Sequence, residues 1–314
     1  MVPSPAVPVA VNIDGVLHGR DDARVSVFDH GFLFGEGVYE VLRTYDGEPF
    51  LYDQHIARLR RSAAAIHLDL PFDNAMLRSW VDRTSAAAGL EGDTYIRILT
   101  TRGIGDLTYD VRATPAPSIV IVVKGQAAPD PRLRNDGIAI ALVPILRNHP
   151  GSVNPIIKSN NLLNNALAMQ EAHRRGAEEA LMCNYRGELS ECSQSNIFLI
   201  TGGVARTPPS RAGLLEGITR AFLFQVGQDV GVTVEEATLM PTDLETADEI
   251  FITSTTREIS PVVRVDDRVI GSGKPGELTL RLWDAYHRRA LETTTSAGTT
   301  RRSLQGLGTR RFHP

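Results

Sequence analysis

The apolar positions in the first part of the chain change between a spacing of two residues and a spacing of three to four. Stretches typical of strands lie at 9–17, 23–31, 37–52, 94–103 and 117–124, and stretches with helical spacing lie at 53–68 and 72–90. Asp46-Gly47 is a strong hairpin sequence, and Gly89 is placed to end the second helix. Both spacings within one segment predict a small α/β unit.

The second part of the chain repeats this mixture after a segment rich in Pro, Asp, Asn and Gly. Strands are predicted at 138–147, 179–184, 196–200, 249–254 and 261–267, and helices at 162–176, 217–231 and 278–292. We therefore expect an α/β (α+β) chain with a small N-terminal domain at 1–124, an interdomain linker at 125–137 and a larger domain at 138–291. Residues 292–314 are polar and lack periodicity, which predicts a disordered tail.

The composition indicates that the partner is a small molecule. The 314 residues carry a net charge of -4 without a basic stripe, which argues against binding to nucleic acid or to a membrane surface. No apolar run approaches the length that spans a bilayer, and the proline-broken N-terminus lacks the basic start of a signal peptide. Cys183 and Cys192 form no pairing framework and the eight histidines no metal-ligand spacing, so we expect a cytoplasmic protein without a metal.

Lysine is nearly absent from the chain, which draws attention to Lys158. Of 33 Lys+Arg residues only Lys124, Lys158 and Lys274 are lysines. Lys158 ends the apolar stretch at 155–157 and precedes a predicted amphipathic helix. Unlike arginine, lysine can become a neutral nucleophile that condenses with an aldehyde. A surface lysine near the start of a helix is the alternative interpretation.

An aldehyde cofactor with a pyridine ring and a phosphate needs an amine, an acid at the ring nitrogen and a site for the anion. Glu191, between a Gly-marked turn and an apolar strand, is the candidate acid, although a solvated glutamate at a turn fits the same pattern. At Gly217 a predicted helix begins with Ile218 and Thr219, whose N–H groups and hydroxyl can converge on an anion. Thr219 serving only as a helix cap is the alternative.

Two further segments offer anion ligands, and each has an ordinary structural alternative. The hydroxyl cluster at 254–256 follows an apolar strand and either adds hydroxyl and amide groups to the anion site or forms a plain turn. Arg58 can give a charge-assisted hydrogen bond to a phosphate. Because Arg60 and Arg61 are close by, Arg58 can equally be one charge on a solvated helix face.

Taken in order, these segments resemble the class IV, or fold type IV, pyridoxal-phosphate-dependent aminotransferases. The motifs that carry the resemblance are FDHGFLFGEGVYEVLR, HIARL, TTRGIGDLTYD, IKSNNLLNN, ELSECSQSNIF, LLEGITR and ITSTTREISPV. They run from about residue 10 to about residue 290, nearly the whole chain. The resemblance implies a fold type IV enzyme with pyridoxal 5'-phosphate as its cofactor. It also implies a homodimer whose active sites lie at the subunit interface.

The resemblance further implies a role for each candidate residue. Lys158 is similar to the Schiff-base lysine that moves the proton, and Glu191 to the partner of the pyridine nitrogen. The implied phosphate ligands are Arg58, Ile218, Thr219 and Thr255, with Leu215 against the ring. The implied substrate-binding residues are Phe34, Tyr39, Val41, Arg43, Tyr95, Arg97, Leu107, Tyr109 and Thr256. The loop at 103–110 would reach the pocket of the neighbouring subunit.

The implied reaction is a ping-pong transfer of an amino group between an amino acid and a 2-oxo acid. Tyr95 and Arg97 resemble the strand that helps receive the substrate carboxylate in branched-chain enzymes, which favours a branched-chain L-amino acid. Tyr39 and Val41 instead match D-amino-acid enzymes. The Arg-x-His carboxylate trap of those enzymes is replaced by Leu-Thr-Tyr at 107–109, so the stereochemistry of the substrate stays open.

Other functions are compatible with the same residues. A D-amino-acid or (R)-amine transaminase would accept a different class of donor, and an aminodeoxychorismate lyase would release pyruvate and return to the aldehyde form without an acceptor. A non-enzymatic carrier of the cofactor would need only the lysine and the anion site. The presence of both Lys158 and Glu191 favours an enzyme over a carrier.

Overall fold

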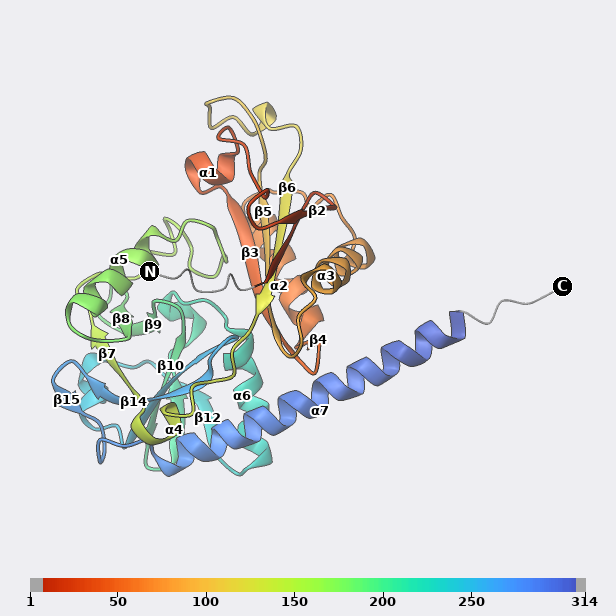
Figure 1. Ribbon diagram of the computed structural model, residues 1–314. Helices are drawn as coiled ribbons and strands as arrows, with labels where there is room; N and C mark the ends of the chain where they lie inside the picture. Colours follow the sequence, from red (N-terminus) through yellow and green to blue (C-terminus); the bar gives the residue numbers. More distant parts are fainter. Residues whose placement is uncertain (1–7, 309–314) are drawn as a thin grey trace, which may run out of the picture.

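The computed structural model describes the backbone of residues 8–308 and the side chains of residues 8–296; the remaining ends of the expected small domain and tail lie outside the described residues. The chain forms two units, each built on its own sheet (Figure 1). The elements of the first unit are β1 (Val9–Ile13), β2 (Val16–Gly19), α1 (His30–Phe34), β3 (Gly37–Tyr45), β4 (Glu48–Pro49), α2 (Tyr52–Ala65), α3 (Asn74–Ala88), β5 (Thr94–Thr101), η1 (Val111–Ala113) and β6 (Ser118–Gly125).

The first unit is an antiparallel sheet in the order β2-β1-β6-β5-β3-β4. Asp46 and Gly47, with φ of 51° and 78°, form the predicted tight turn between β3 and β4. Val38 and Leu42 of β3 are fully buried in a core that contains residues of α2 and α3. Because side chains alternate along a strand, Tyr39 and Val41 point to the opposite face, where they meet the second unit.

The second unit is a mixed nine-stranded sheet in the order β12-β11-β10-β13-β14-β7-β8-β9, with β15 paired to β14. Its elements are α4 (Leu133–Asp136), β7 (Ile138–Leu142), α5 (Leu163–Arg174), β8 (Glu179–Cys183), β9 (Leu189–Cys192), β10 (Asn196–Thr201), β11 (Val204–Thr207), η2 (Ser210–Ala212), α6 (Ile218–Asp229), β12 (Thr233–Glu236), η3 (Pro241–Glu245), β13 (Glu249–Ser254), β14 (Glu258–Val265), β15 (Arg268–Val269) and α7 (Glu277–Gly308). The segment expected to link the units lies between β6 and β7 and contains the short helix α4.

The two units share part of one hydrophobic core. Tyr45 at the end of β3 and Phe50 after β4 are buried among residues of α6 and α7. The Phe50 ring makes edge contacts with Phe222 and Tyr286, at centroid distances of 5.2 and 6.0 Å. Helix α7 starts under the second unit and runs past the lower end of the first (Figure 1). This shared packing fixes the first sheet relative to the second.

One stretch predicted as a strand takes a different form. Residues 23–31 form turns and a loop that lead into the short helix α1. Asp29 caps this helix by accepting a hydrogen bond from Gly31 N at 2.7 Å, a local bond that competes with strand pairing. The apolar alternation in this stretch therefore does not reflect pairing within a sheet.

The prediction of a disordered tail from residue 292 is wrong for the described part of that segment. Helix α7 continues to Gly308. Thr294, only 2% exposed, donates its hydroxyl proton to the Ala290 carbonyl at 3.0 Å. The helix therefore extends beyond the point where the apolar periodicity ends, with Thr294 on its buried side.

Candidate active site

A cavity of about 640 Å³ lies between the two units. The first unit lines it with β3, α2 and β5, and the second with β9, the segments before α5 and α6, and the turn after β13. Every candidate cofactor residue lines this cavity, namely Arg58, Lys158, Glu191, Leu215, Ile218, Thr219 and Thr255. The fold thus brings into one place residues that are widely separated in the sequence.

Lys158 lies in the loop before α5, which begins only at Leu163 rather than directly after the lysine. The Lys158 N–H donates to Ser62 Oγ at 3.1 Å, and its carbonyl accepts from Tyr39 N at 2.9 Å. These bonds tie its main chain to α2 and β3. Its Nζ lies 4.5 Å from the centroid of the Tyr39 ring. Among residues 8–296 no carboxylate forms an ion pair with Nζ, so the amine is available to a ligand.

Glu191 lies in β9 and is 5% exposed, so it is not a solvated glutamate at a turn. Its Oε1 accepts from Arg147 Nε at 2.7 Å, and its Oε2 accepts from Leu215 N at 3.0 Å and Asn196 Nδ2 at 3.3 Å. Burial raises the pKa of the Glu191 carboxyl, whereas Arg147 and the Leu215 N–H oppose that rise. Three donors therefore fix the direction of this carboxylate at one wall of the cavity.

Helix α6 begins at the wall of the same cavity, three residues after Leu215, whose N–H donates to Glu191. Gly217 is its N-cap and brings no capping side chain, while Thr219 of the first turn is 4% exposed. The free N–H groups and the positive end of the helix dipole border the cavity here. A Cβ at Gly217 would lie 2.0 Å from Asn196 Oδ1, so glycine permits this close approach.

Arg58 reaches the cavity from α2 and is 4% exposed, so it is not one charge on a solvated face. Its Nη1 donates to the Glu216 carbonyl at 2.8 Å, which places the guanidinium beside the segment that leads into α6. Its Nε and Nη2 donate to the two carboxylate oxygens of Glu40 at 2.7 and 2.8 Å. Arg58 thus joins α2, β3 and the start of α6.

These residues fit an aldehyde cofactor that carries a pyridine ring and a phosphate. The unpaired amine of Lys158 matches the aldehyde, and the oriented carboxylate of Glu191 matches a protonated ring nitrogen. Arg58 and the N–H groups at the start of α6 are donors that an anion would satisfy. Because buried polar groups without partners are costly, this set of donors is best satisfied with an anion bound.

Five of the candidate substrate residues line the rest of the cavity, namely Tyr39, Val41, Tyr95, Arg97 and Thr256. The Arg97 guanidinium carbon lies 4.2 Å from the centroid of the Tyr39 ring, so Tyr39 contacts both Arg97 and Lys158. No ion pair to Arg97 occurs among the described side chains. An arginine with free donors in a cavity can receive a carboxylate from a ligand.

Arg43 does not line the cavity, so the structure corrects its proposed contact with substrate. Its side chain is 2% exposed and pairs with Glu258 Oε1 at 2.8 Å and with Asp93 Oδ2 at 3.1 Å. Glu258 also accepts from the Tyr45 hydroxyl at 2.9 Å and from Trp283 Nε1 at 3.0 Å. The buried carboxylate binds the guanidinium and holds β3 against the start of β14, just after the turn that contains Thr256.

The other three candidate substrate residues, Phe34, Leu107 and Tyr109, also lie outside this chain's cavity. They belong to α1 and to the loop between β5 and β6, which form the projecting upper end of the first unit (Figure 1). The rings of Phe34 and Tyr109 are 4.9 Å apart at their centroids. Leu107 and Tyr109 are 71% and 85% exposed. Within one chain none of these three residues lines the candidate active site.

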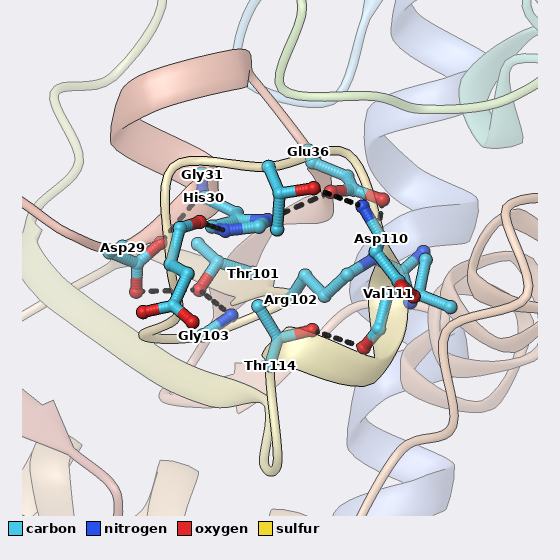
Figure 2. Close-up of polar contacts among 12 residues, drawn as sticks. Asp29, His30, Gly31, Glu36, Thr101, Arg102, Gly103, Asp110, Val111 and Thr114 are labelled. Atoms are coloured by element: carbon cyan, nitrogen blue, oxygen red, sulfur yellow. Dashed lines mark hydrogen bonds and ion pairs between the residues drawn. The ribbon is translucent and has the colours of Figure 1, made fainter.

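A polar cluster fixes this projecting loop against α1 (Figure 2). His30 is fully buried, and its Nε2 lies 2.9 Å from the Asp106 carbonyl oxygen. Because a carbonyl only accepts, this contact requires a proton on Nε2. Glu36 accepts from Arg102 and lies 3.4 Å from His30 Nδ1. The cluster gives the exposed side chains of the loop defined positions.

Three residues that shape the cavity were not singled out from the sequence: Arg147, Asn196 and Glu40. Arg147 ends an apolar, strand-like stretch, and a charged residue at such a position can indicate a functional contact. Glu40 shares the core face of β3 with Val38 and Leu42, so the period-two pattern alone marks it as a buried carboxylate. Asn196 opens an apolar strand and carried no comparable sequence feature.

We also searched the described residues for a metal site and for a membrane-spanning helix. No group of three or more His, Cys, Asp or Glu there has the arrangement of a metal site. None of the described helices combines the length and apolar character needed to cross a membrane. Cys183 and Cys192 are free thiols, and burial raises the pKa of both.

Comparison with known sequences gives concordant results. A sequence model of the family described as Amino-transferase class IV matches residues 37–265. A Methanocaldococcus jannaschii protein with the provisional name branched-chain-amino-acid aminotransferase is 39% identical over 277 residues, which cover 88% of this chain and 94% of that protein. The D-alanine aminotransferase of Listeria monocytogenes serotype 4b is 37% identical over 276 residues, or 87% of this chain and 93% of that enzyme.

Solved structures with the same architecture include two branched-chain aminotransferases. The enzyme from Thermoproteus uzoniensis, solved with norvaline, gives a TM-score of 0.83 at 33% identity and covers 90% of this chain and 95% of its own. The holo-form of the enzyme from Thermobaculum terrenum gives a TM-score of 0.82 at 26% identity, with coverages of 91% and 95%. Both similarities extend over the two units that enclose the cavity.

Proposed function

This chain belongs to the class IV aminotransferases, and from that premise we propose that it transfers the amino group of a branched-chain L-amino acid to a 2-oxo acid. It is a fold type IV, pyridoxal-phosphate-dependent transaminase. The observation that supports its catalytic part is the shared cavity that contains Lys158, Glu191 and the start of α6. Pyridoxal phosphate, when bound, supplies an aldehyde that joins the amine and a ring that withdraws electrons.

Lys158 and Glu191 have complementary roles in the proposal. Lys158 would bind the aldehyde through Nζ, and the same Nζ would carry the proton removed from the substrate Cα. Glu191 accepts a hydrogen bond from the ring nitrogen and keeps a proton on it. Arg147, at 2.7 Å from Glu191 Oε1, favours the ionised carboxylate that this task needs.

The other end of the cavity orients the phosphate in this proposal. Arg58 donates from its guanidinium, and Ile218 and Thr219 donate from the first turn of α6. Thr255 adds its hydroxyl and amide from the turn after β13. Leu215 packs against the ring, so the ligand is held from its phosphate to its reacting carbon.

The remaining wall of the cavity supports the proposed substrate class. Tyr95 and Arg97 border it with free donors, which supports the receipt of a carboxylate as in branched-chain enzymes. A D-amino acid is the second candidate, because Tyr39 and Val41, the two positions that match D-amino-acid enzymes, also line the cavity. Such local differences typically change discrimination by about 1–3 kcal/mol, so the two candidates need a direct measurement.

A panel of donors tests the proposal. We would mix the holoprotein with L-leucine, L-valine, D-alanine, D-glutamate or (R)-1-phenylethylamine without an acceptor and record the absorbance change of the cofactor. The proposal predicts that L-leucine and L-valine convert it to the pyridoxamine form fastest. Fastest conversion with D-alanine would replace the first candidate by the second. No conversion with any donor would contradict transamination of these substrates.

We also propose that the protein is a homodimer in which the projecting loop completes the neighbour's active site. The support is the exposure of Leu107 and Tyr109 on an ordered loop that cannot reach its own cavity. Light scattering should give the mass of a dimer. Mixing Lys158→Ala and Tyr109→Ala subunits should restore activity, because one site of the mixed dimer keeps both native residues. A monomer, or no gain on mixing, would contradict this arrangement.

A further inference from the structure

Glu40 is a charged residue in the middle of a hydrophobic core. It lies on the face of β3 that carries Val38 and Leu42, and all three side chains are 0% exposed. Transfer of a carboxylate from water into such surroundings is costly unless hydrogen bonds and opposite charge compensate for the lost solvation. A hydrophobic residue would fill this position at lower cost, so the carboxylate needs an explanation beyond packing.

Two residues of α2 compensate for the buried charge. Arg58 donates from Nε and Nη2 to the two oxygens of Glu40, at 2.7 and 2.8 Å. His55 Nδ1 lies 2.7 Å from Glu40 Oε2, and His55 Nε2 has no partner among the described residues. Burial would raise the pKa of Glu40, but Arg58 and His55 hold it below the ordinary value; burial lowers the pKa of His55. The cluster is therefore an ionised pair supported by a neutral histidine that donates from Nδ1.

This cluster determines which way Arg58 faces. The two parallel bonds to Glu40 fix the plane of the guanidinium, and a third bond runs from Nη1 to the Glu216 carbonyl. These three hydrogen bonds use three of the five N–H groups of Arg58, so two N–H groups remain. Arg58 lines the cavity, whereas Glu40 lies behind it and does not. The buried carboxylate thus leaves the remaining donors to the cavity.

We propose that Glu40 is a positioning residue for the phosphate end of the cavity: it orients Arg58 toward the cofactor phosphate without touching the cofactor. The inference rests on the proposed function, in which Arg58 is a phosphate ligand. Glu40 also cancels the net charge of Arg58, so the pair binds phosphate by directed hydrogen bonds rather than by excess positive charge. His55 in turn fixes the carboxylate through Nδ1. Tyr39 and Val41 flank Glu40, so one strand serves both the substrate wall and the phosphate end.

Two ligands separate positioning from general stability. The full-length protein, freed of cofactor, would be titrated with pyridoxal phosphate and with pyridoxal, which has the same ring and aldehyde but no phosphate. Glu40→Gln should raise the dissociation constant for pyridoxal phosphate about tenfold and leave that for pyridoxal unchanged, because only the phosphate uses Arg58. Equal weakening for both ligands would indicate a merely structural role. Unchanged or tighter binding of pyridoxal phosphate would overturn the proposal as well.

Further variants keep the test decisive if Glu40→Gln does not fold. His55→Gln removes one support of the carboxylate without removing its charge, and should weaken pyridoxal phosphate binding in the same direction but by less. Glu40→Asp keeps the charge but shortens the side chain, so it should weaken the binding of pyridoxal phosphate relative to the native protein and leave the binding of pyridoxal unchanged. If neither His55→Gln nor Glu40→Asp changes the ratio of the two dissociation constants, the proposal fails.

Arg58→Met separates failure of this inference from failure of the proposed function. It should weaken pyridoxal phosphate and spare pyridoxal, and Glu40→Gln should add little selectivity in the Arg58→Met background. If Arg58→Met does not discriminate between the ligands, Arg58 is not a phosphate ligand and the proposed function is wrong on that point. If Arg58→Met discriminates and Glu40→Gln does not, only the positioning role of Glu40 is wrong.

Discussion

Two regions beside the cavity each contain a buried carboxylate paired with an arginine, but the pairs face opposite ways. From the roles that we propose for them, we call these regions the reaction end and the phosphate end. At the reaction end the carboxylate of Glu191 borders the cavity, and Arg147 binds one of its oxygens at 2.7 Å. At the phosphate end Arg58 borders the cavity, and Glu40 lies behind it. A glutamate–arginine pair therefore presents a hydrogen-bond acceptor, the Glu191 carboxylate, in one region and hydrogen-bond donors, from the Arg58 guanidinium, in the other.

The difference shows how position rather than composition decides what a buried ion pair does. Such pairs are a poor source of stability, because desolvation of both charges offsets most of their attraction. Burial raises the pKa of Glu191 despite Arg147, whereas Arg58 and His55 hold the pKa of Glu40 below its ordinary value. The pKa of the carboxyl at the reaction end is thus raised, whereas the carboxyl at the phosphate end is held in its ionised form.

The largest effect should come from the reaction end. Lys158→Ala removes the one lysine that lines the cavity among the described residues and should lower kcat by roughly 10³-fold or more, while the protein stays folded. Steady-state kinetics and circular dichroism would check both parts. Lys274→Ala is the matched control, because Lys274 is exposed and pairs with Asp136 at 3.7 Å. Near-normal turnover in Lys158→Ala would show that Lys158 is not required for the reaction, and would contradict the role that we propose for the reaction end.

Glu191→Gln should give the next largest effect. The amide keeps the shape of the side chain but loses the charge that holds a proton on the ring nitrogen, so kcat should fall by about 10²–10³-fold. Transient kinetics of the donor half-reaction would locate the loss in the proton-transfer step. Glu235→Gln, which changes an exposed carboxylate paired with Arg206, should leave the rate unchanged. A loss confined to KM would assign Glu191 to binding instead.

Arg147→Met should have a smaller effect that depends on pH. Arg147 lowers the pKa of Glu191 against the effect of burial, so its removal should raise that pKa further. More Glu191 is then protonated at a given pH, and activity requires a more alkaline solution. We expect about a tenfold loss of kcat/KM at neutral pH and an acid limb shifted to higher pH. A loss of equal size at every pH would argue against this coupling.

Thr219→Val should have the smallest effect on turnover, and its effect should appear in binding. The change removes one hydroxyl donor from the phosphate end without changing the volume greatly. Loss of one hydroxyl hydrogen bond to the charged phosphate, about 1.5 kcal/mol, should raise the dissociation constant of pyridoxal phosphate about tenfold and spare kcat at saturating cofactor. Thr219→Ser keeps the hydroxyl and should restore affinity. A reduction of kcat at saturating cofactor would place Thr219 in the reaction rather than in phosphate binding.

The sequence predicted most where a local pattern and a backbone feature coincide. Asp46-Gly47 forms the expected hairpin turn, Gly217 opens the expected helix, and Gly89 ends α3 in a left-handed conformation with φ of 57°. These features depend on few residues, because turn and cap geometry are set locally. The class of enzyme and its cofactor followed instead from the resemblance of an ordered series of sequence motifs to a known family, and the family comparison confirms both.

The sequence predicted least where the structure depends on contacts between the two units. The resemblance implied that Arg43 binds substrate, yet Arg43 pairs with Glu258 from the other unit. Arg147 gave little indication of its contact with Glu191, 44 residues later. Phe34, Tyr109 and the rest of the projecting loop lie outside their own cavity, a fact that no spacing along the chain expresses.

Reduction of the holoprotein with borohydride, followed by peptide mass spectrometry, tests most directly whether Lys158 holds the cofactor. The chain has only three lysines, Lys124, Lys158 and Lys274, so the position of a phosphopyridoxyl label can be assigned without ambiguity. We predict the label on the peptide that contains Lys158 and on no other. A label on Lys124 or Lys274 instead, or an unlabelled Lys158 in protein that retains its activity, would contradict the assignment of this cavity as the active site.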